Sequence, residues 1–132
     1  MAFVVDASVV ASWLLPDETD ATAATALRRL EAEDAVAPSL WWFEMRNLLL
    51  ANERRGRLDA GLTNTILSRL KRLPIILDQS SEEVPLLDLA RRYRLTAYDA
   101  AYLELAVRLR SPLATLDKAL RRAARKEGVG LI

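Results

Sequence analysis

Short apolar runs alternate with helical segments along this chain, and this alternation restricts its fold more than any other feature of the sequence. The runs are rich in aliphatic and β-branched residues, and each has the length of one buried strand. The predicted strands are AFVV ending at Asp6, AVA before Pro38, PIIL ending at Asp78, LATL ending at Asp117, and VGLI at 129–132 as a candidate edge strand. Strands that alternate with helices form a parallel sheet that helices cover on both faces. We therefore expect an α/β fold with a central, mainly parallel sheet of four to five short strands.

Helical patterns fill the segments between the predicted strands. Pro85 suits a first helical turn, and Gly56 and Gly128 stand where helices commonly end. The predicted helices span residues 7–15, 19–33, 39–55, 59–72, 82–93, 96 onward and 118–127. No repeats, low-complexity segments or linkers interrupt this pattern, and 132 residues suit one compact core. We therefore expect a single domain over residues 1–132.

The chain contains no cysteine and no histidine. This composition excludes disulfides, thiolate nucleophiles, Cys/His zinc sites and histidine general bases. An enzyme of this kind would work through carboxylates, either as acid and base or as ligands of hard cations such as Mg²⁺ or Mn²⁺. No apolar run reaches membrane-spanning length, and the apolar N-terminus lacks basic residues and is interrupted by Asp6, unlike a signal peptide. We expect a cytoplasmic protein with no membrane partner.

Three aspartates lie where predicted strands and helices meet. Asp6 and Asp117 each follow a strand, and Asp99 lies in the first turn of a helix. The carboxyl ends of parallel strands form the ligand-binding edge of such a sheet, so these positions favour a shared site. Each aspartate also has a structural alternative, because Asp6 and Asp117 could cap the helices that follow them and Asp99 completes a capping box with Thr96.

A fourth carboxylate, Glu44, lies within the strongly apolar segment SLWWFEMRNLLLA. Leu40, Glu44, Asn47 and Ala51 share one stripe of the predicted helix, which sets a carboxylate beside an amide on a helix with little other polar surface. A charge held against a core is unfavourable unless it is paired or bound to a cation. The alternative is that Glu44 simply faces solvent.

Convergence of these four carboxylates would have an energetic consequence. At about 4 Å and an effective dielectric constant of about 20, each pair of like charges costs about 4 kcal/mol. Either some groups stay protonated or a divalent cation neutralises them. Metal-held water that attacks a phosphodiester needs acidic ligands and an open coordination position, but no histidine. Ser8 and Thr115, each two residues from an aspartate, are candidates to orient a carboxylate or a ligand water, or else to cap helices.

Four segments in order resemble the PIN domain family, and in particular the VapC toxins of bacterial VapBC toxin–antitoxin pairs. They are VVDASVVASWLLPDE, PSLWWFEMRNLL, LTAYDAAYLELA and LATLDKALRRAARKEGV, and the resemblance covers nearly the whole chain. It implies a three-layer α/β/α fold and a Mg²⁺- or Mn²⁺-dependent endoribonuclease that hydrolyses RNA phosphodiester bonds with metal-activated water. By position it implies Asp6 and Asp99 as the main metal ligands of the catalytic site, with Glu44 and Asp117 completing it directly or through water. Asp78 lies outside this acidic set, and we expect it in a loop or cap.

The resemblance also implies partners, namely a cognate VapB-type antitoxin whose extended segment inhibits the site and a second copy of the chain in a homodimer. A basic stripe on the last predicted helix could hold an RNA backbone or be a solvated helix face. Its members are Lys118, Arg121, Arg122 and Arg125. Three consecutive aromatic residues cannot all point into one core, so we expect at least one near the surface, either partly buried at an edge or in an interface. The aromatic residues concerned are Trp13, Trp41, Trp42 and Phe43.

Two other functions are open at this stage. The first is a non-cleaving RNA- or protein-binding PIN module that binds metal weakly, although the complete acidic set argues against it. The second is a receiver-like phosphoacceptor domain, which also gathers aspartates around Mg²⁺. The paired acidic residues expected after the first strand of such a domain are missing, since FVVDAS supplies one.

Overall fold

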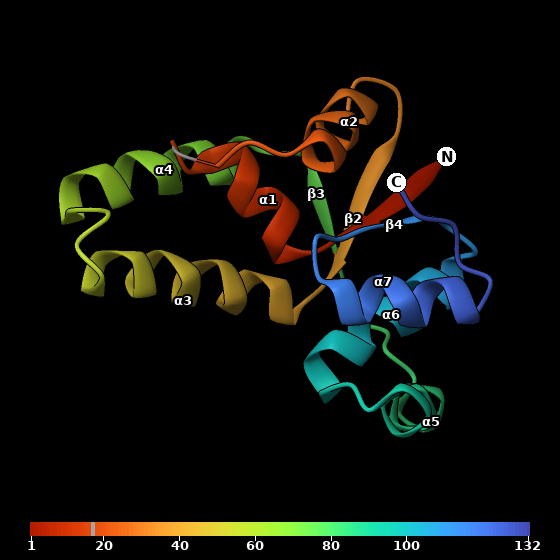
Figure 1. Cartoon of the computed structure of the whole chain (residues 1–132). Helices are drawn as coiled ribbons and strands as arrows, with labels where there is room; N and C mark the ends of the chain where they lie inside the picture. Colours follow the sequence, from red (N-terminus) through yellow and green to blue (C-terminus); the bar gives the residue numbers. More distant parts are fainter. Residues whose placement is uncertain (17) are drawn as a thin grey trace.

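The computed structural model describes residues 1–16 and 18–132. Strands and helices alternate along most of the chain, as the sequence predicts (Figure 1). Their order is β1 (Ala2–Val5), α1 (Ala7–Leu14), α2 (Ala21–Arg29), β2 (Asp34–Pro38), α3 (Leu40–Arg54), α4 (Ala60–Arg72), β3 (Ile75–Asp78), α5 (Glu83–Tyr93), α6 (Ala97–Leu109), β4 (Leu113–Ala114) and α7 (Lys118–Lys126).

The strands form a parallel sheet in the order β3-β2-β1-β4, which confirms the predicted α/β class. Val4 in the central strand β1 pairs with Val36 on one side and with Leu113 on the other. The predicted edge strand at 129–132 contributes only an isolated bridge between Leu131 and Leu113. The described sheet therefore has four strands, at the lower end of the expected range.

Helices cover both faces of the sheet. On one face α6 contacts β1, β2 and β4, and α5 and α7 pack against α6 (Figure 1). On the other face α2 contacts β4 and packs against α1. Residues Phe3, Val4 and Val5 of β1 are fully buried, as expected for a strand covered on both faces, and α6 is buried continuously from Ala100 to Ala106. The layers form the expected three-layer α/β/α arrangement.

Side-chain caps decide where several elements begin and end. Helix α2 starts at Ala21 and not at the predicted Thr19, because the Asp20 carboxylate accepts a hydrogen bond from the Ala23 amide at 3.0 Å. Strand β4 ends two residues before the predicted Leu116. The Leu116 amide donates to the Ser8 hydroxyl at 3.1 Å, so it is not available to continue the sheet.

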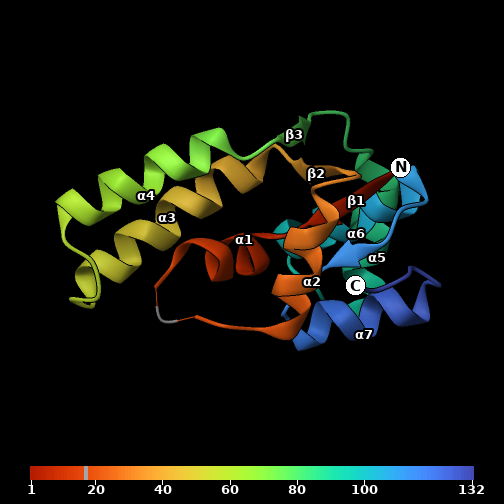
Figure 2. The ribbon, with the colours of Figure 1, turned by 90° about the horizontal axis from the view of Figure 1, so that it is seen from above.

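Helices α3 and α4 run side by side and extend away from the sheet as a hairpin (Figure 2). Gly56, with φ at +75°, lies in the turn that follows α3, where a residue with a side chain would be strained. The described helices include none with the length and apolar character needed to span a membrane.

Candidate functional site

The carboxylates predicted from the sequence come from elements that meet at the carboxyl edge of the sheet. Asp6 follows β1 directly, and Asp117 lies between β4 and α7. Glu44 lies in the helix that follows β2, and Asp99 is in the first turn of α6. Figure 1 shows α1, α3 and α7 beginning at this same edge.

Asp6 is the most enclosed of these groups, with 6% of its surface exposed. One carboxylate oxygen, Oδ1, accepts hydrogen bonds from the Ser8 hydroxyl at 2.6 Å and from the Val9 amide at 3.2 Å. The other, Oδ2, accepts a hydrogen bond from the Thr115 hydroxyl. Burial raises the pKa of Asp6, the hydrogen bonds oppose this rise, and the negative charge of Asp117 adds to it. Asp6 therefore caps α1 and also presents a carboxylate at the sheet edge.

Two hydroxyl groups join the turn after β1 to the turn after β4. Thr115 Oγ1 donates to Asp6 and accepts from the Asp117 amide at 3.1 Å. Ser8 Oγ likewise donates to Asp6 and accepts from the Leu116 amide at 3.1 Å. Ser8 and Thr115, two of the three supporting residues expected from the sequence, thus contact the Asp6 carboxylate and fix its orientation, whereas the hydrogen bonds of the described residues do not join the third, Asn47, to it.

Glu44 is held by a residue that sequence reasoning did not select. The Tyr102 hydroxyl donates a hydrogen bond to Glu44 Oε1 at 2.5 Å, and Tyr102 itself is 2% exposed. Burial raises the pKa of Glu44, the bond from Tyr102 lowers it, and the negative charges of Asp99 and Asp6 raise it further. Burial and the neighbouring carboxylate also hold the pKa of Tyr102 far above its usual range, so its hydroxyl remains a donor. A buried phenol needs a polar partner, and that need is the signal in the sequence that could have drawn attention to Tyr102.

Asp99 and Asp117 each lie at a helix start. The Asp99 amide donates to Thr96 Oγ1 at 3.1 Å, which provides one half of the predicted capping box. Burial, followed by the negative charge of Asp117, raises the pKa of Asp99. Asp117 accepts a hydrogen bond from the Ala119 amide at 2.9 Å and so caps α7. Asp99 and Asp117 can therefore lie at the start of a helix, as a cap requires, and also at the shared edge of the sheet.

The four carboxylates influence one another, and the described part of the chain gives them no basic partner. Asp117 acts on Asp6 and on Asp99, and both of those act on Glu44. None of the ion pairs found among the described residues includes any of the four. A region of negative charge without a counter-charge favours either protonation or a cation.

The described part of the chain does not contain three acidic side chains close enough together to hold one metal ion between them. The close cluster considered from the sequence is therefore not formed in this conformation. The donor chemistry still fits Mg²⁺, which prefers oxygen ligands and commonly binds through one or two carboxylates while keeping several waters. The site fits an ion of this kind without needing all four carboxylates in direct contact.

Two further polar residues of the sequence prediction lie outside this arrangement. Asn47 is exposed on α3, and the hydrogen bonds found among described residues do not join it to Glu44. Asp78 pairs with Arg108 at 2.9 Å, and Arg108 also binds Glu104 at 2.8 Å. The Arg108 guanidinium lowers the pKa of Asp78. This pairing gives Asp78 a structural role, in agreement with its expected place outside the acidic set.

The basic stripe lies on α7, next to the acidic edge. Its residues line a surface hollow of about 360 Å³, and they are Lys118, Arg121, Arg122 and Arg125. Arg121 donates a hydrogen bond to the Thr115 carbonyl at 3.0 Å, so the stripe is anchored to the same turn that supports Asp6. Lys118, Arg122 and Arg125 are exposed.

The aromatic residues divide between core and surface, as predicted. Trp41 is 5% exposed, whereas Trp42 is 43% and Phe43 is 71% exposed. Trp13 is partly buried, and its indole N–H donates to the Ala23 carbonyl at 2.7 Å. The prediction that at least one aromatic residue lies near the surface is confirmed.

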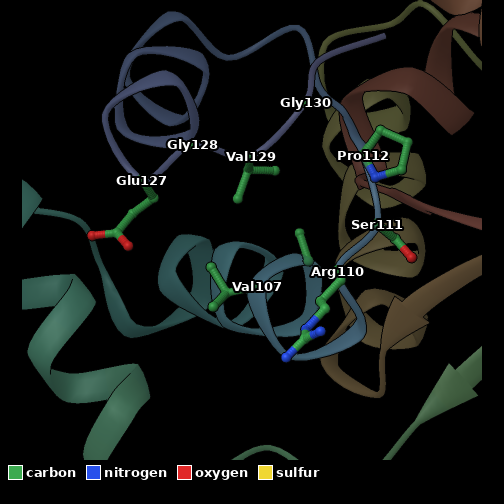
Figure 3. Close-up of a pocket in the computed structure, with 9 residues that line it drawn as sticks. Val107, Arg110, Ser111, Pro112, Glu127, Gly128, Val129 and Gly130 are labelled. Carbon is green, nitrogen blue, oxygen red and sulfur yellow. The ribbon is translucent and has the colours of Figure 1, made fainter.

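A separate hollow of about 340 Å³ lies between the end of α6 and the segment after α7 (Figure 3). Val107 and Val129 face each other across it, and Glu127 is its acidic residue. The Glu127 carboxylate already accepts hydrogen bonds from Tyr93 at 2.6 Å and from Arg92. None of the four site carboxylates lines this hollow, so it is distinct from the acidic edge.

Comparison with known proteins identifies the family of the chain. Residues 3–126 match the PIN domain family. Ribonuclease VapC3 of Pyrobaculum aerophilum is 33% identical over 123 residues, which are 91% of this chain and 92% of that protein.

Solved structures show the same fold. PAE2754 from Pyrobaculum aerophilum aligns with a TM-score of 0.72 and 24% identity, covering 99% of this chain and 83% of that chain. FitAcB from Neisseria gonorrhoeae aligns with a TM-score of 0.66 and 19% identity, covering 100% of this chain and 96% of that chain. The chain therefore belongs to the PIN domain family, and its similarity to the VapC-type members, which four sequence segments indicated, is confirmed.

Proposed function

We propose that this protein is a metal-dependent endoribonuclease and the toxin of a type II toxin–antitoxin pair. The observation that carries the proposal is the set of four mutually repelling carboxylates at the sheet edge, which have no basic partner among the described residues. The similarity of the whole chain to Ribonuclease VapC3 supports ribonuclease activity for this protein.

Asp6 and Asp99 would hold a Mg²⁺ or Mn²⁺ ion, and Glu44 and Asp117 would complete its surroundings directly or through water. When bound, such an ion would supply positive charge at the phosphate and lower the pKa of a water molecule that it holds, which favours loss of a proton from that water. Burial is the main cause of the raised pKa values of Asp6, Glu44 and Asp99, and repulsion between the carboxylates adds to it. A bound cation would stabilise the ionised form of such groups, which supports this assignment.

The side chains of the protein position the reacting groups. Ser8 and Thr115 fix Asp6, and Tyr102 fixes Glu44 through Oε1. Glu44 Oε2 is then the oxygen that can accept a hydrogen bond from the attacking water. Such fixed geometry favours the reaction, because the ligands need not reorganise as charge develops on the phosphate.

The basic stripe on α7 would hold the RNA backbone. Arginine suits this role because its planar guanidinium binds phosphate oxygens in pairs. Each phosphate contact adds to the salt dependence of binding, so affinity should fall steeply between low and moderate salt. The stripe begins directly after Asp117, which would bring the bound backbone to the acidic edge.

The proposal includes protein partners. We infer a cognate VapB-type antitoxin that blocks the site, a homodimeric toxin, and action in the cytoplasm on cellular RNA. Size-exclusion chromatography with light scattering tests the dimer, and loss of RNA cleavage on co-expression with a VapB-type protein tests the inhibitor.

The decisive experiment is cleavage of a mixed pool of cellular RNA with Mg²⁺ or Mn²⁺. Wild-type protein should cleave, whereas Asp99→Asn protein and chelator-treated protein should not. Asp34→Asn is the matched control, because Asp34 is an exposed aspartate outside the site and should keep full activity. Full activity in Asp99→Asn would contradict the assignment.

The second candidate function is a PIN module that binds RNA or protein without cleaving it. The lack of a three-ligand cluster among the described residues is the observation that favours it. A folded, antitoxin-free wild-type protein that binds RNA but cleaves nothing with either metal would support this function over the nuclease.

A further inference from the structure

An exposed pair of aromatic rings lies at the start of α3, one residue before Glu44. Phe43 is 71% exposed and Trp42 is 43% exposed. Solvent-exposed aromatic rings of this size leave a large apolar area in water, and neighbouring ones often mark a binding surface. We call Trp42, Phe43 and Arg46 the aromatic platform.

Contacts within the platform hold its rings in place. The ring centroids of Trp42 and Phe43 are 4.9 Å apart, with an angle of 71° between the rings. The Arg46 guanidinium lies 3.9 Å from the centroid of Trp42, and it donates a hydrogen bond to the Trp42 carbonyl at 3.2 Å. Arginine therefore orients Trp42, while most of the Phe43 side chain remains open to solvent.

The platform and the acidic edge lie on the same part of the molecule. Helix α3 starts directly after the carboxyl end of β2, and the platform occupies its first two turns. Phe43 and Glu44 are consecutive, so their Cα atoms are about 3.8 Å apart. Consecutive helical residues project to different sides of the helix, so Phe43 lies beside Glu44 at the same level of α3 while Glu44 faces Tyr102 on α6.

The charge around the platform is positive. Arg46 and Lys71 line a hollow of about 190 Å³ beside Trp42, together with apolar residues of α4 and β3 and without an acidic residue. The ion pairs found within the described residues include neither cation. An aromatic surface bordered by two cations matches the chemistry of a single-stranded nucleic acid, whose bases stack and whose phosphates are negative.

We propose that the aromatic platform stacks an unpaired nucleobase of the RNA, with Phe43 as the main contact and with Arg46 and Lys71 binding the adjacent phosphates. The proposal rests on the proposed function and adds a base-stacking residue, Phe43, to the surface that binds the RNA. A second copy of the chain fits this surface less well, because pairing the same face would bring like charges together.

Stacking on one aromatic side chain contributes about 1–3 kcal/mol per base, which is about a 5-fold to 150-fold change in affinity. The test measures binding of labelled single-stranded RNA to Asp99→Asn protein, in which cleavage is blocked, by fluorescence anisotropy. The reference ligands are an abasic ribose-phosphate oligomer of the same length and an RNA duplex. Phe43→Leu removes the aromatic face but keeps an apolar side chain, whereas Phe43→Tyr keeps the face.

Asp99→Asn protein should bind the single-stranded RNA about 5-fold to 150-fold more tightly than the abasic oligomer. Phe43→Leu should remove most of this preference and Phe43→Tyr should keep it, while duplex binding should not change. Leu50→Ala is the matched control, because Leu50 is 46% exposed on the same helix but outside the platform, and it should keep the preference.

Two outcomes would overturn the proposal. One is equal affinity for single-stranded and abasic RNA, and the other is a preference that Phe43→Leu leaves unchanged, which would assign the platform to a protein partner. Cleavage by wild-type protein is measured separately. If the preference depends on Phe43 but wild-type protein cleaves nothing, the nuclease proposal fails and the base-stacking proposal stands.

Discussion

Tyr102→Phe tests whether the contact between α6 and α3 holds Glu44 in place. The change removes one hydroxyl and leaves the buried ring, so it creates no large cavity. The lost interaction is the hydrogen bond from Tyr102 Oη to Glu44 Oε1, which measures 2.5 Å. We expect the variant to fold, to be less stable than the wild type, and to have lower nuclease activity.

The expected loss of stability follows from the type of bond. A hydrogen bond to a charged group contributes about 1.5–3 kcal/mol, and the partial exposure of Glu44 reduces this to about 1–2 kcal/mol. At about 2.1 cal/mol/K per residue, a chain of 132 residues has an unfolding entropy of about 280 cal/mol/K at its midpoint. A loss of about 1.5 kcal/mol then lowers the Tm by about 5 °C.

The loss should depend on pH. The bond from Tyr102 lowers the pKa of Glu44, so its removal raises that pKa further above the ordinary value. The Tyr102 hydrogen bond stabilises the wild type relative to Tyr102→Phe when Glu44 is ionised in both proteins. This difference in stability decreases as the pH falls through the pKa of Glu44. The difference in Tm should therefore be largest at pH 7.5 and smaller at pH 4.

The assay is thermal unfolding by circular dichroism in chelator at pH 7.5 and at pH 4. Tyr98→Phe is the matched control, since Tyr98 lies on the same helix and is 65% exposed. A Tyr102→Phe protein as stable as the Tyr98→Phe protein at pH 7.5 would refute the reasoning, because the bond to Glu44 would then contribute nothing in solution.

Three further predictions concern the carboxylates. Asp6→Asn should abolish cleavage, yet it should raise the free energy of unfolding by on the order of 1 kcal/mol at pH 7.5 without metal, because burial and Asp117 raise the Asp6 pKa. In urea unfolding this gain in stability should disappear as the pH falls below that pKa. Equal stability of the variant and the wild type at pH 7.5 would contradict the prediction. Mg²⁺ at ten times its Kd should stabilise wild-type protein by about 1.4 kcal/mol, seen as a higher Tm, and an equal rise in Asp99→Asn would count against the ligand assignment. Asp78→Asn should lower the free energy of unfolding by about 0.5–1 kcal/mol at pH 7, since Arg108 lowers the Asp78 pKa. The difference between variant and wild type should vanish as the pH falls through that lowered pKa. A difference that persists at pH 2 would exclude this ion pair as its cause.

Much of the sheet could be predicted because buried parallel strands leave uninterrupted apolar runs in the sequence. The runs at β1 and β2 are strands of this kind, and the run at β3 forms a partly exposed edge strand. The run at 113–116 is only half a strand, because its second half turns into the site and bonds to Asp6 and Ser8. The hydroxyl of Thr115 bonds to Asp6 and so helps to end the strand. The apolar pattern of the sequence does not indicate where a polar side chain will form a hydrogen bond.

The location of the candidate site could also be predicted, since Asp6 and Asp117 follow strands whose carboxyl ends share one edge. The detailed geometry of the site could not be predicted from the sequence. Tyr102 and Glu44 are 58 residues apart, and nothing in the local spacing of either helix links them. The distances among the carboxylates depend on how α3 and α6 pack, so the sequence could not indicate that they stay too far apart for a three-ligand cluster.

The bond between Thr115 and Asp6 joins residues 109 positions apart, and it has a consequence for the timing of synthesis. Chains are made from the N-terminus at about 5–20 residues per second, so about 5–20 seconds pass between the synthesis of these two residues. During that time β1 has no β4 beside it, and Asp6 has neither Thr115 nor Asp117 near it. Each new molecule therefore stays without a complete acidic edge until the last part of its chain has been made.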